Sequence, residues 1–184
     1  MLIFTETIDR FPLFFCRNVR GAMTESEKRM HRVCFTGHRP EKLTRDEKSI
    51  LQDLEREIRK AVADGLNVFI TGMARGVDIW AAQIVLKLRD EGLDVKLICA
   101  CPYEGFERKW SQEWQKAYRE ILSSADFVKY VCNGYSPACF QIRNEWMVDH
   151  SARVIAVFNG EKGGTQNTID HAMKVGVPVV RIEG

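Results

Sequence analysis

The sequence of 184 residues lacks any apolar run of the roughly 20 residues that a helix needs to cross a bilayer. Its opening residues do contain a short apolar run, but Glu6 and Asp9 precede that run, where a secretion signal carries basic residues. No internal repeat or low-complexity segment is present. We therefore expect a soluble, cytoplasmic protein with no membrane partner.

The sequence also lacks a strong charge of either sign. Its 27 Lys and Arg residues exceed its 25 Asp and Glu residues by only two, so no overall basic field attracts nucleic acid. Apolar residues make up 45% and charged residues 28%, which is typical of one ordinary folded domain. A nucleic-acid partner would therefore need a local basic patch.

No pair of cysteines has the CxxC spacing of a redox motif or a zinc site. The cysteines instead lie mostly inside apolar runs, which favours reduced, buried thiols and no metal site. The six are Cys16, Cys34, Cys99, Cys101, Cys132 and Cys139.

Apolar runs typical of buried strands alternate with helical patterns. Helices of this length between strands predict right-handed crossovers, and the fold class is α/β, a three-layer Rossmann-like arrangement with an open, mostly parallel sheet and helices on both faces. This domain is expected over 30–184, with 1–29 a loosely attached N-terminal extension. The predicted strands are 31–36, 67–71, 95–101, 127–131, 153–158 and 177–182, and the last two predicted helices are 137–150 and 165–175.

The third helical pattern is rich in aromatic residues. Phe106, Trp110 and Trp114 are four residues apart, which predicts one stripe on a single helix. Such a stripe is more often core or dimer interface than a ligand site.

In an open parallel sheet, ligands bind outside the carboxyl ends of the strands. Four loops expected there carry glycine or paired polar residues, at 36–40, 71–78, 101–105 and 159–165. None matches the GxGxxG fingerprint of dinucleotide binding or the GxxxxGK[ST] phosphate loop. A conventional NAD or ATP site is therefore not favoured, and no cofactor is predicted.

The loop at 71–78, TGMARGVD, is the most informative. Gly72 ends a strand and Gly76 precedes a helix, so the backbone can turn tightly and present N–H groups to an anion. Arg75 is placed to reach that anion, and Asp78 lies in the first helical turn, where the helix dipole favours a carboxylate. The alternative is a plain turn in which Asp78 caps its own helix.

The loop at 159–165, NGEKGGT, has a similar design. Gly163 and Gly164 permit close backbone approach, and Thr165 is a natural N-cap whose hydroxyl can instead face a phosphate. Glycine pairs are also common in ordinary surface turns. After the first strand, His38 and Arg39 are candidates for phosphate or ribose contacts, although a loop histidine is more often only solvated.

Tyr103 follows the third strand and offers an aromatic face on which a nucleobase can stack. For this residue a packing role is the favoured interpretation.

Three separated segments carry a family resemblance. TGMARGVDIWAA (71–82) resembles the SG-x-A-x-G-x-D-x-x-A-A/H signature of the DprA/Smf group, and 141–180 resembles that group's later block. The later span is also similar to the LOG, or lysine-decarboxylase-like, group. Both groups belong to the SLOG superfamily of Rossmann-like domains, and TGHRPEKL (36–43) looks most like its YpsA-like family.

The resemblance implies a nucleotide-like ligand held between Gly72–Asp78, Arg143–Asn144 and Gly163–Thr165. It also implies a homo-oligomer, because SLOG relatives commonly self-associate. Arg143 occupies the place of the LOG arginine that holds the sugar phosphate, and a guanidinium suits that task because its planar fork binds phosphate through two hydrogen bonds. The candidate binding residues are Gly37, His38, Arg39, Gly72, Ala74, Arg75, Gly76, Asp78, Arg143, Asn144, Gly163, Gly164 and Thr165.

One position departs from the LOG pattern. The catalytic glutamate of that group would lie three residues after Thr165, where this chain has Thr168. Cleavage of an N-glycosidic bond generally requires a carboxylate. Glu145 and Asp149 lie four residues apart on one helical face and are the alternative carboxylates, with Arg143 and Glu145 the weak catalytic candidates. A structural or solvated acidic pair is the favoured interpretation.

Three functions therefore remain. The leading one is binding or sensing of a nucleotide or nucleotide-derived small molecule, such as ADP-ribose or a nucleoside monophosphate. The second is a LOG-like hydrolase of a nucleotide N-glycosidic bond. The third is a DprA-like protein that binds single-stranded DNA, which the near-neutral charge balance disfavours.

Overall fold

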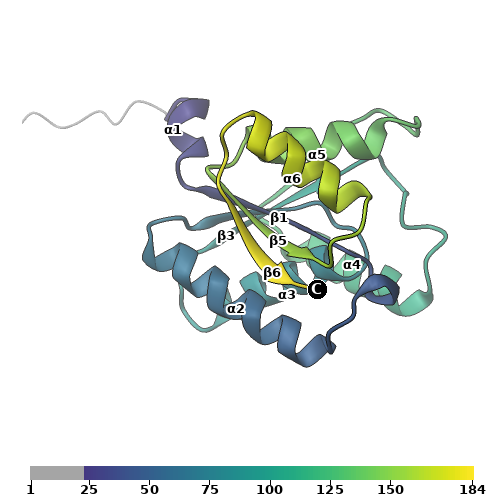
Figure 1. The fold of residues 1–184 in the computed structure, drawn as a ribbon, viewed down its shortest axis with the longest axis horizontal. Coiled ribbons are helices and arrows are strands. Elements are labelled where there is room, and N and C mark those ends of the chain that lie inside the picture. The colour runs from purple at the N-terminus through teal and green to yellow at the C-terminus, as the bar shows by residue number, and fades with distance from the viewer. Residues whose placement is uncertain (1–22) are drawn as a thin grey trace, which may run out of the picture.

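A computed structural model describes residues 23–184 and contains a six-stranded sheet between two layers of helices (Figure 1). The predicted three-layer α/β class is confirmed. The strands are β1 (Arg32–Gly37), β2 (Val68–Thr71), β3 (Lys96–Cys101), β4 (Phe127–Tyr130), β5 (Arg153–Phe158) and β6 (Val179–Glu183). The helices are α1 (Glu25–Arg29), η1 (Pro40–Lys42, a 3-10 turn), α2 (Glu47–Ala63), α3 (Val77–Asp90), α4 (Gln112–Ser124), α5 (Cys139–Asp149) and α6 (Gly164–Lys174).

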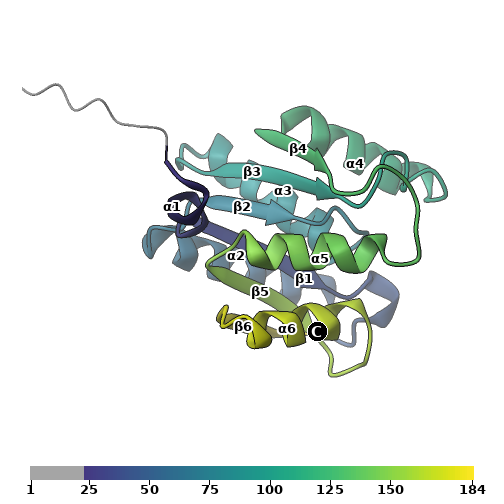
Figure 2. The ribbon, with the colours of Figure 1, turned by 90° about the horizontal axis from the view of Figure 1, so that it is seen from above.

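All neighbouring strands pair in parallel, in the order β4-β3-β2-β1-β5-β6. Helices α5 and α6 cover one face, and α2, α3 and α4 cover the other (Figures 1 and 2). The chain builds outward from β1 to β4 and then returns to the other side of β1 as β5. The order therefore reverses between β1 and β5, the position at which such sheets bind ligands.

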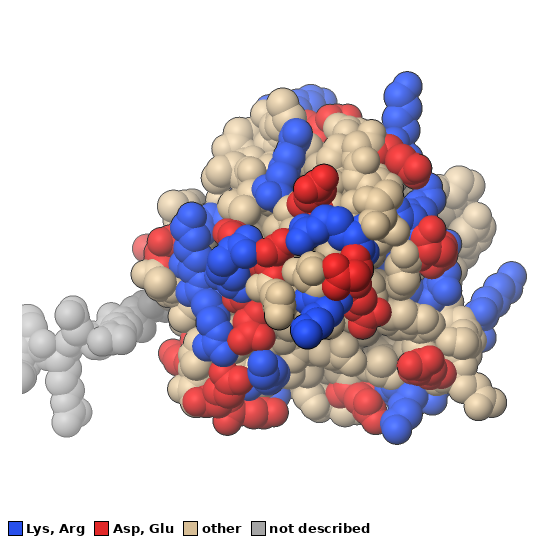
Figure 3. Space-filling model, turned by 60° about the horizontal axis from the view of Figure 1, so that its bottom comes forward, with Lys and Arg blue, Asp and Glu red and all other residues tan. Residues whose placement is uncertain are grey.

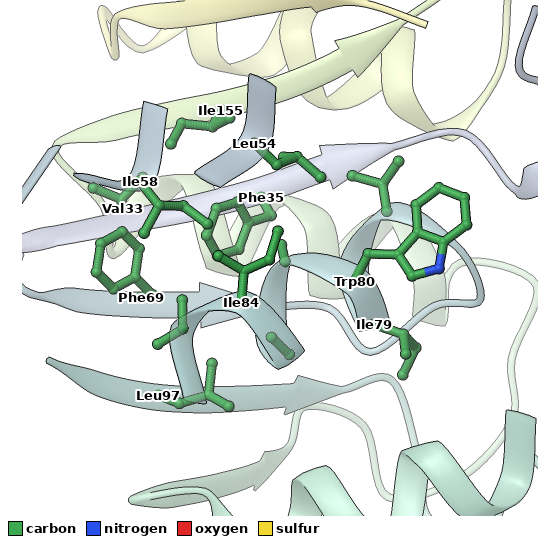
Figure 4. Close-up of a cluster of buried hydrophobic side chains, with 14 of the residues drawn as sticks. Val33, Phe35, Leu54, Ile58, Phe69, Ile79, Trp80, Ile84, Leu97 and Ile155 are labelled. Carbon is green, nitrogen blue, oxygen red and sulfur yellow. The ribbon is translucent and has the colours of Figure 1, made fainter. Parts of the chain in front are cut away.

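The core has one layer on each face of the sheet. Alternate residues of β1 point to opposite faces, so Val33 and Phe35 pack with α2 and α3 while Cys34 packs under α5 and α6. In the larger layer the rings of Phe35 and Phe69 stack 5.8 Å apart (Figure 4). The burial of apolar residues on both faces explains why the strands read as continuous apolar runs.

Helix α2 shows how local sequence produces this packing. Asp46 caps it by accepting a hydrogen bond from the Ser49 N–H at 2.9 Å. Ile50, Leu54 and Ile58 recur at helical spacing and are fully buried against the sheet.

The predicted aromatic stripe on the third helix is wrong in part. Helix α4 begins at Gln112, so Trp114 lies on it but Phe106 and Trp110 lie in the preceding turns. These two rings pack edge-on, 5.1 Å apart, and Trp110 packs on Tyr118 of α4 at 5.8 Å. The four-residue spacing reflected shared packing on the core rather than one helix.

The predicted extension, residues 1–29, lies mostly outside the described residues. From residue 23 onward the structure shows α1, in which Glu25 pairs with Arg32 at 3.0 Å. Arg29 Nε also donates to the Ser151 carbonyl at 3.1 Å. This part of the extension therefore contacts the domain, and the loose attachment of the remainder stays a prediction.

The cysteines within residues 23–184 are all free, and four of these five are buried. Burial raises the pKa of the Cys34 thiol to about 12 and that of Cys101 to about 11, so both stay protonated at neutral pH. Packing is thus their structural role, while Cys16 lies outside the described residues. No helix between residues 23 and 184 is long and apolar enough to cross a membrane.

Replacing Phe69 by Ala is expected to lower the free energy of unfolding by about 3–5 kcal/mol, because the change opens a cavity beside Phe35. Urea denaturation measures the loss. As a control, Met173→Ala on the exposed side of α6 is expected to change stability by less than about 0.5 kcal/mol. Equal effects of the two substitutions would contradict this account of the core.

Candidate functional site

A cavity of about 330 Å³ lies at the carboxyl ends of the central strands, where the strand order reverses. Its wall comes from the loops after β1, β2 and β5 and from one face of α5. The lining residues are Phe35, Thr36, Gly37, His38, Arg39, Glu41, Lys42, Ala74, Asp78, Phe140, Arg143, Asn144, Met147, Gly163, Gly164 and Thr165.

The turn between β2 and α3 forms one wall. The Thr71 hydroxyl donates to the Asp78 carbonyl at 2.8 Å and accepts from the Met73 N–H at 3.2 Å. This bracing holds Met73 at φ 59°, a conformation that side-chain-bearing residues rarely adopt. The strand thereby turns sharply enough to bring Ala74 and Asp78 to the cavity.

Asp78 does not cap its own helix. Gly76 is the N-cap of α3 and no side chain caps it, while Asp78 Oδ2 accepts from the Ala74 N–H at 3.2 Å. The side chain is about 5% exposed, and burial raises its pKa to about 6, against the opposing effect of Arg143.

Arg143 projects from α5 toward this turn. Its Nη1 lies 3.9 Å from Asp78 Oδ2 and donates to the Gly72 carbonyl, while its Nε donates to Asn144 Oδ1 at 2.8 Å. The side chain is about 5% exposed, and burial lowers its pKa although Asp78 favours the charged form. Arg143 is thus a fixed cation in the wall rather than a mobile surface arginine.

Two glycines permit this close packing. A Cβ at Gly72 would lie 2.7 Å from Asp78 Oδ2 and would overlap the Arg143 guanidinium. A Cβ at Gly76, which has φ 87°, would lie 2.8 Å from the Pro40 ring. The two glycines therefore leave the space that the neighbouring side chains of the site occupy, and neither glycine lines the cavity.

His38 contributes a polar atom with no partner. Its side chain is about 4% exposed, its ring stacks 5.6 Å from that of Phe158, and its Nε2 has no hydrogen-bond partner within the described structure. Burial, followed by the charge of Lys42, lowers the pKa of the imidazole, so it is neutral at pH 7. A buried polar atom without a partner is costly unless a ligand or water satisfies it.

The third wall is the N-terminus of α6. The helix begins at Gly164 with Gly163 as its N-cap, so the predicted N-cap role of Thr165 is wrong. Thr165 lies within the first turn instead, and its buried side chain lines the cavity. No side chain caps this helix, and its first N–H groups have no partners within the helix.

Several predicted site residues lie elsewhere. Arg75 pairs with Glu41 at 3.0 Å and does not line the cavity. Glu145 accepts from Gln141 Nε2 at 2.9 Å, and Asp149 pairs with His171 at 2.8 Å. Neither carboxylate reaches the cavity wall.

Thr168, at the position of the LOG glutamate, does not line the cavity either. Its hydroxyl donates to the Gly164 carbonyl at 2.8 Å, inside α6.

Six of the lining residues are not predicted from the sequence. Of these, Lys42 and Phe140 add a positive charge and an aromatic ring, and neither lies in one of the four glycine-containing loops expected at the strand ends. The six are Phe35, Thr36, Glu41, Lys42, Phe140 and Met147.

Larger hollows occur on other faces. One of about 600 Å³ lies at the amino ends of the strands, and one of about 510 Å³ lies between α2 and α3. Neither gathers glycine loops, uncapped helix N-termini or buried ionisable side chains. Size alone therefore does not identify the site.

The sheet order and this cavity define a Rossmann-like domain with a cavity at its topological switch point. Residues 33–176 match the family model YpsA, described as the YspA SLOG family, and the chain belongs to this family.

Two relatives have names that state no activity. The chain is 36% identical over 118 residues to the "Uncharacterized SPbeta prophage-derived protein YoqJ" of Bacillus subtilis, covering 58% of this chain and 69% of the relative. It is 32% identical over 127 residues to a "UPF0398 protein" of Bacillus thuringiensis, covering 68% of this chain and 69% of that protein.

Two solved structures share the fold. DNA processing protein A of Helicobacter pylori aligns with a TM-score of 0.62 at 21% identity, over 87% of this chain and 68% of that one. DNA processing protein A of Streptococcus pneumoniae aligns with a TM-score of 0.62 at 20% identity, over 84% and 51%. The first is described by its single-stranded DNA binding mode.

Replacing Gly72 by Ala is expected to destabilise the fold by about 1–3 kcal/mol, because the new methyl group displaces Arg143 or Asp78. Gly134→Ala is the matched control, since nothing lies within 4 Å of its added Cβ. Chemical denaturation of both variants measures the difference. If Gly72→Ala were as stable as Gly134→Ala, the close approach would not be required.

The pKa of Asp78 predicts a pH dependence. The native pKa of about 6 exceeds the unfolded value of about 3.9, so the native state holds more protons between these values and the free energy of unfolding falls as pH rises through them. Asp78→Asn lacks this titration. Relative to that variant, the wild type is expected to lose about 1–3 kcal/mol between pH 4 and pH 7. Parallel stability curves of the two proteins would contradict the assignment.

Proposed function

We propose that the cavity binds a nucleotide or a nucleotide-derived small molecule, such as ADP-ribose or a nucleoside monophosphate. The observation that carries the proposal is the unpartnered Nε2 of His38, a buried polar atom in the wall of a cavity at the switch point. A phosphate or ribose oxygen would satisfy it. The volume of about 330 Å³ is at the lower end of the range for small-molecule sites.

The N-terminus of α6 supports a phosphate in particular. Its uncapped N–H groups and the positive end of the helix dipole lie beside Gly163, Gly164 and Thr165 in the same wall as His38. Arg143 and Lys42 add positive charge to the wall, each with a carboxylate partner. Binding or sensing is the proposed role, and no catalytic residue is assigned.

A hydrolase receives less support. Glu145 and Asp149 are engaged outside the cavity, and Thr168 replaces the carboxylate of the LOG pattern. Asp78 and Glu41 are the carboxylates in the wall, and they face Arg143 and Arg75 respectively. Measurement of base release tests this alternative directly.

Binding of single-stranded DNA is the second candidate, because a structural neighbour carries that description. An extended basic groove would favour it. Figure 3 instead shows Lys and Arg interspersed with Asp and Glu over one face of the molecule. On α2 and α3 these charges pair, as Arg59 does with Glu55 and Glu91 at 2.7 Å.

The test combines thermal shift with base release for a panel of nucleoside monophosphates, ADP-ribose, NAD and cytokinin-type nucleotides. A ligand at 100 times its Kd is expected to stabilise the protein by about 2.7 kcal/mol, a Tm rise of roughly 5–10 °C. His38→Ala is expected to lower the affinity for that ligand about 10-fold or more, because it removes one hydrogen bond to a charged group.

His31→Ala is the matched control, because this exposed histidine lies at the amino end of β1, away from the cavity. Stabilisation without base release supports binding, and base release supports the hydrolase. If no small molecule stabilises the fold while a single-stranded oligonucleotide binds with a steep salt dependence, the proposal fails.

A further inference from the structure

Three aromatic side chains from separate segments meet beside the cavity. Tyr103 follows β3, Tyr135 lies in the loop after β4, and Phe140 lies in the first turn of α5. The Tyr103 ring packs edge-on against Tyr135 at 5.8 Å and against Phe140 at 6.2 Å. We call these three residues the aromatic face.

The aromatic face is exposed yet firmly supported. Tyr135 is about 71% exposed and Phe140 about 40%, although large aromatic side chains are usually buried. Behind them Phe106 packs on Phe140 at 6.4 Å and on Tyr118 of α4 at 5.5 Å. Because Tyr118 is buried in the core, the exposed rings rest on a rigid base.

Phe140 joins the aromatic face to the cavity. It lines the cavity together with Arg143, Asn144 and Met147, which follow it on α5 by three, four and seven residues. This spacing places all four on one face of the helix. A ligand held by the cavity therefore meets an aromatic ring at the cavity wall.

We propose that the aromatic face, with Phe140 as its central contact, binds the nucleobase of the ligand whose phosphate the cavity holds. The inference rests on the proposed function and adds to it the location of the base. Any planar nucleobase can stack on an exposed aromatic ring, and such stacking contributes about 1–3 kcal/mol per base. Continuity with the phosphate site distinguishes this surface from an isolated apolar patch.

The experiment compares AMP with ribose 5-phosphate, which lacks the base, by calorimetry on the full chain. Wild type is expected to bind AMP about 5- to 100-fold more tightly than ribose 5-phosphate. Phe140→Ala is expected to remove most of that preference by weakening the binding of AMP more than that of ribose 5-phosphate, whereas Phe140→Trp retains the preference.

Phe127→Ala is the matched control, because Phe127 is about 54% exposed but lies at the amino end of β4. It is expected to leave both affinities unchanged. Thermal denaturation of each variant confirms that it is folded, and Tyr135→Ala provides a second test because that side chain is almost free of the core.

The outcomes separate the two proposals. If ribose 5-phosphate binds in a His38-dependent way but AMP binds no more tightly, or if Phe140→Ala and Tyr135→Ala both leave the preference intact, the base site is overturned and the proposed function stands. If neither probe binds while an oligothymidylate does, both proposals fail in favour of single-stranded DNA. If none of the three probes binds, the base site is overturned, and the proposed function fails as well if ADP-ribose and the other nucleotides of the panel do not stabilise the fold.

Discussion

The contact of Arg143 with the β2–α3 turn is the constraint on which the site depends. Arg143 comes from α5, above the sheet, and reaches the Gly72 carbonyl and the Asp78 carboxylate at the beginning of α3, below it. The contact therefore ties the two helical layers together at the edge where the strands end. Cavity walls from different layers keep their relative positions because this buried contact joins them.

A buried ion pair of this kind is not a source of large net stability. Desolvation of both charges opposes their attraction, but loss of one partner leaves the other charge buried and uncompensated, at a cost of about 3–5 kcal/mol. The pair instead favours one arrangement of α5 against the β2–α3 turn over the alternatives. Gly72 is part of that specification, because any side chain there would occupy the space of the guanidinium.

The sequence predicts the framework well for a clear physical reason. Doubly buried strands give continuous apolar runs, and α2 gives apolar residues at helical spacing, so the layers follow from these patterns. Glycines at 72, 76, 163 and 164 locate the turns at the strand ends.

The features that the sequence does not predict, such as the exact beginnings of helices and the partners of charged side chains, depend on tertiary contacts. Phe106 and Trp110 share a four-residue spacing with Trp114 but pack from turns, since burial on the core does not require a helix. Likewise, the role of Thr165 depends on where α6 begins, since the helix begins at Gly164 with Gly163 as its N-cap. From the sequence, Arg39, Arg75 and Arg143 are equally good candidates for binding the ligand. Only the structure shows that Arg75 pairs with Glu41 and does not line the cavity.

The charge pairing also bears on the kind of ligand that the cavity suits. Arg143 faces Asp78, Arg75 faces Glu41, and Lys42 lies 3.4 Å from Glu161. Pairing weakens the long-range field of these three cations, and the exposed Arg39 is a further cation that lines the cavity. Short-range donors remain, namely the α6 N–H groups and the His38 imidazole. Donors of this kind act over hydrogen-bond distances and select one phosphate by position, which favours a small molecule over a long strand.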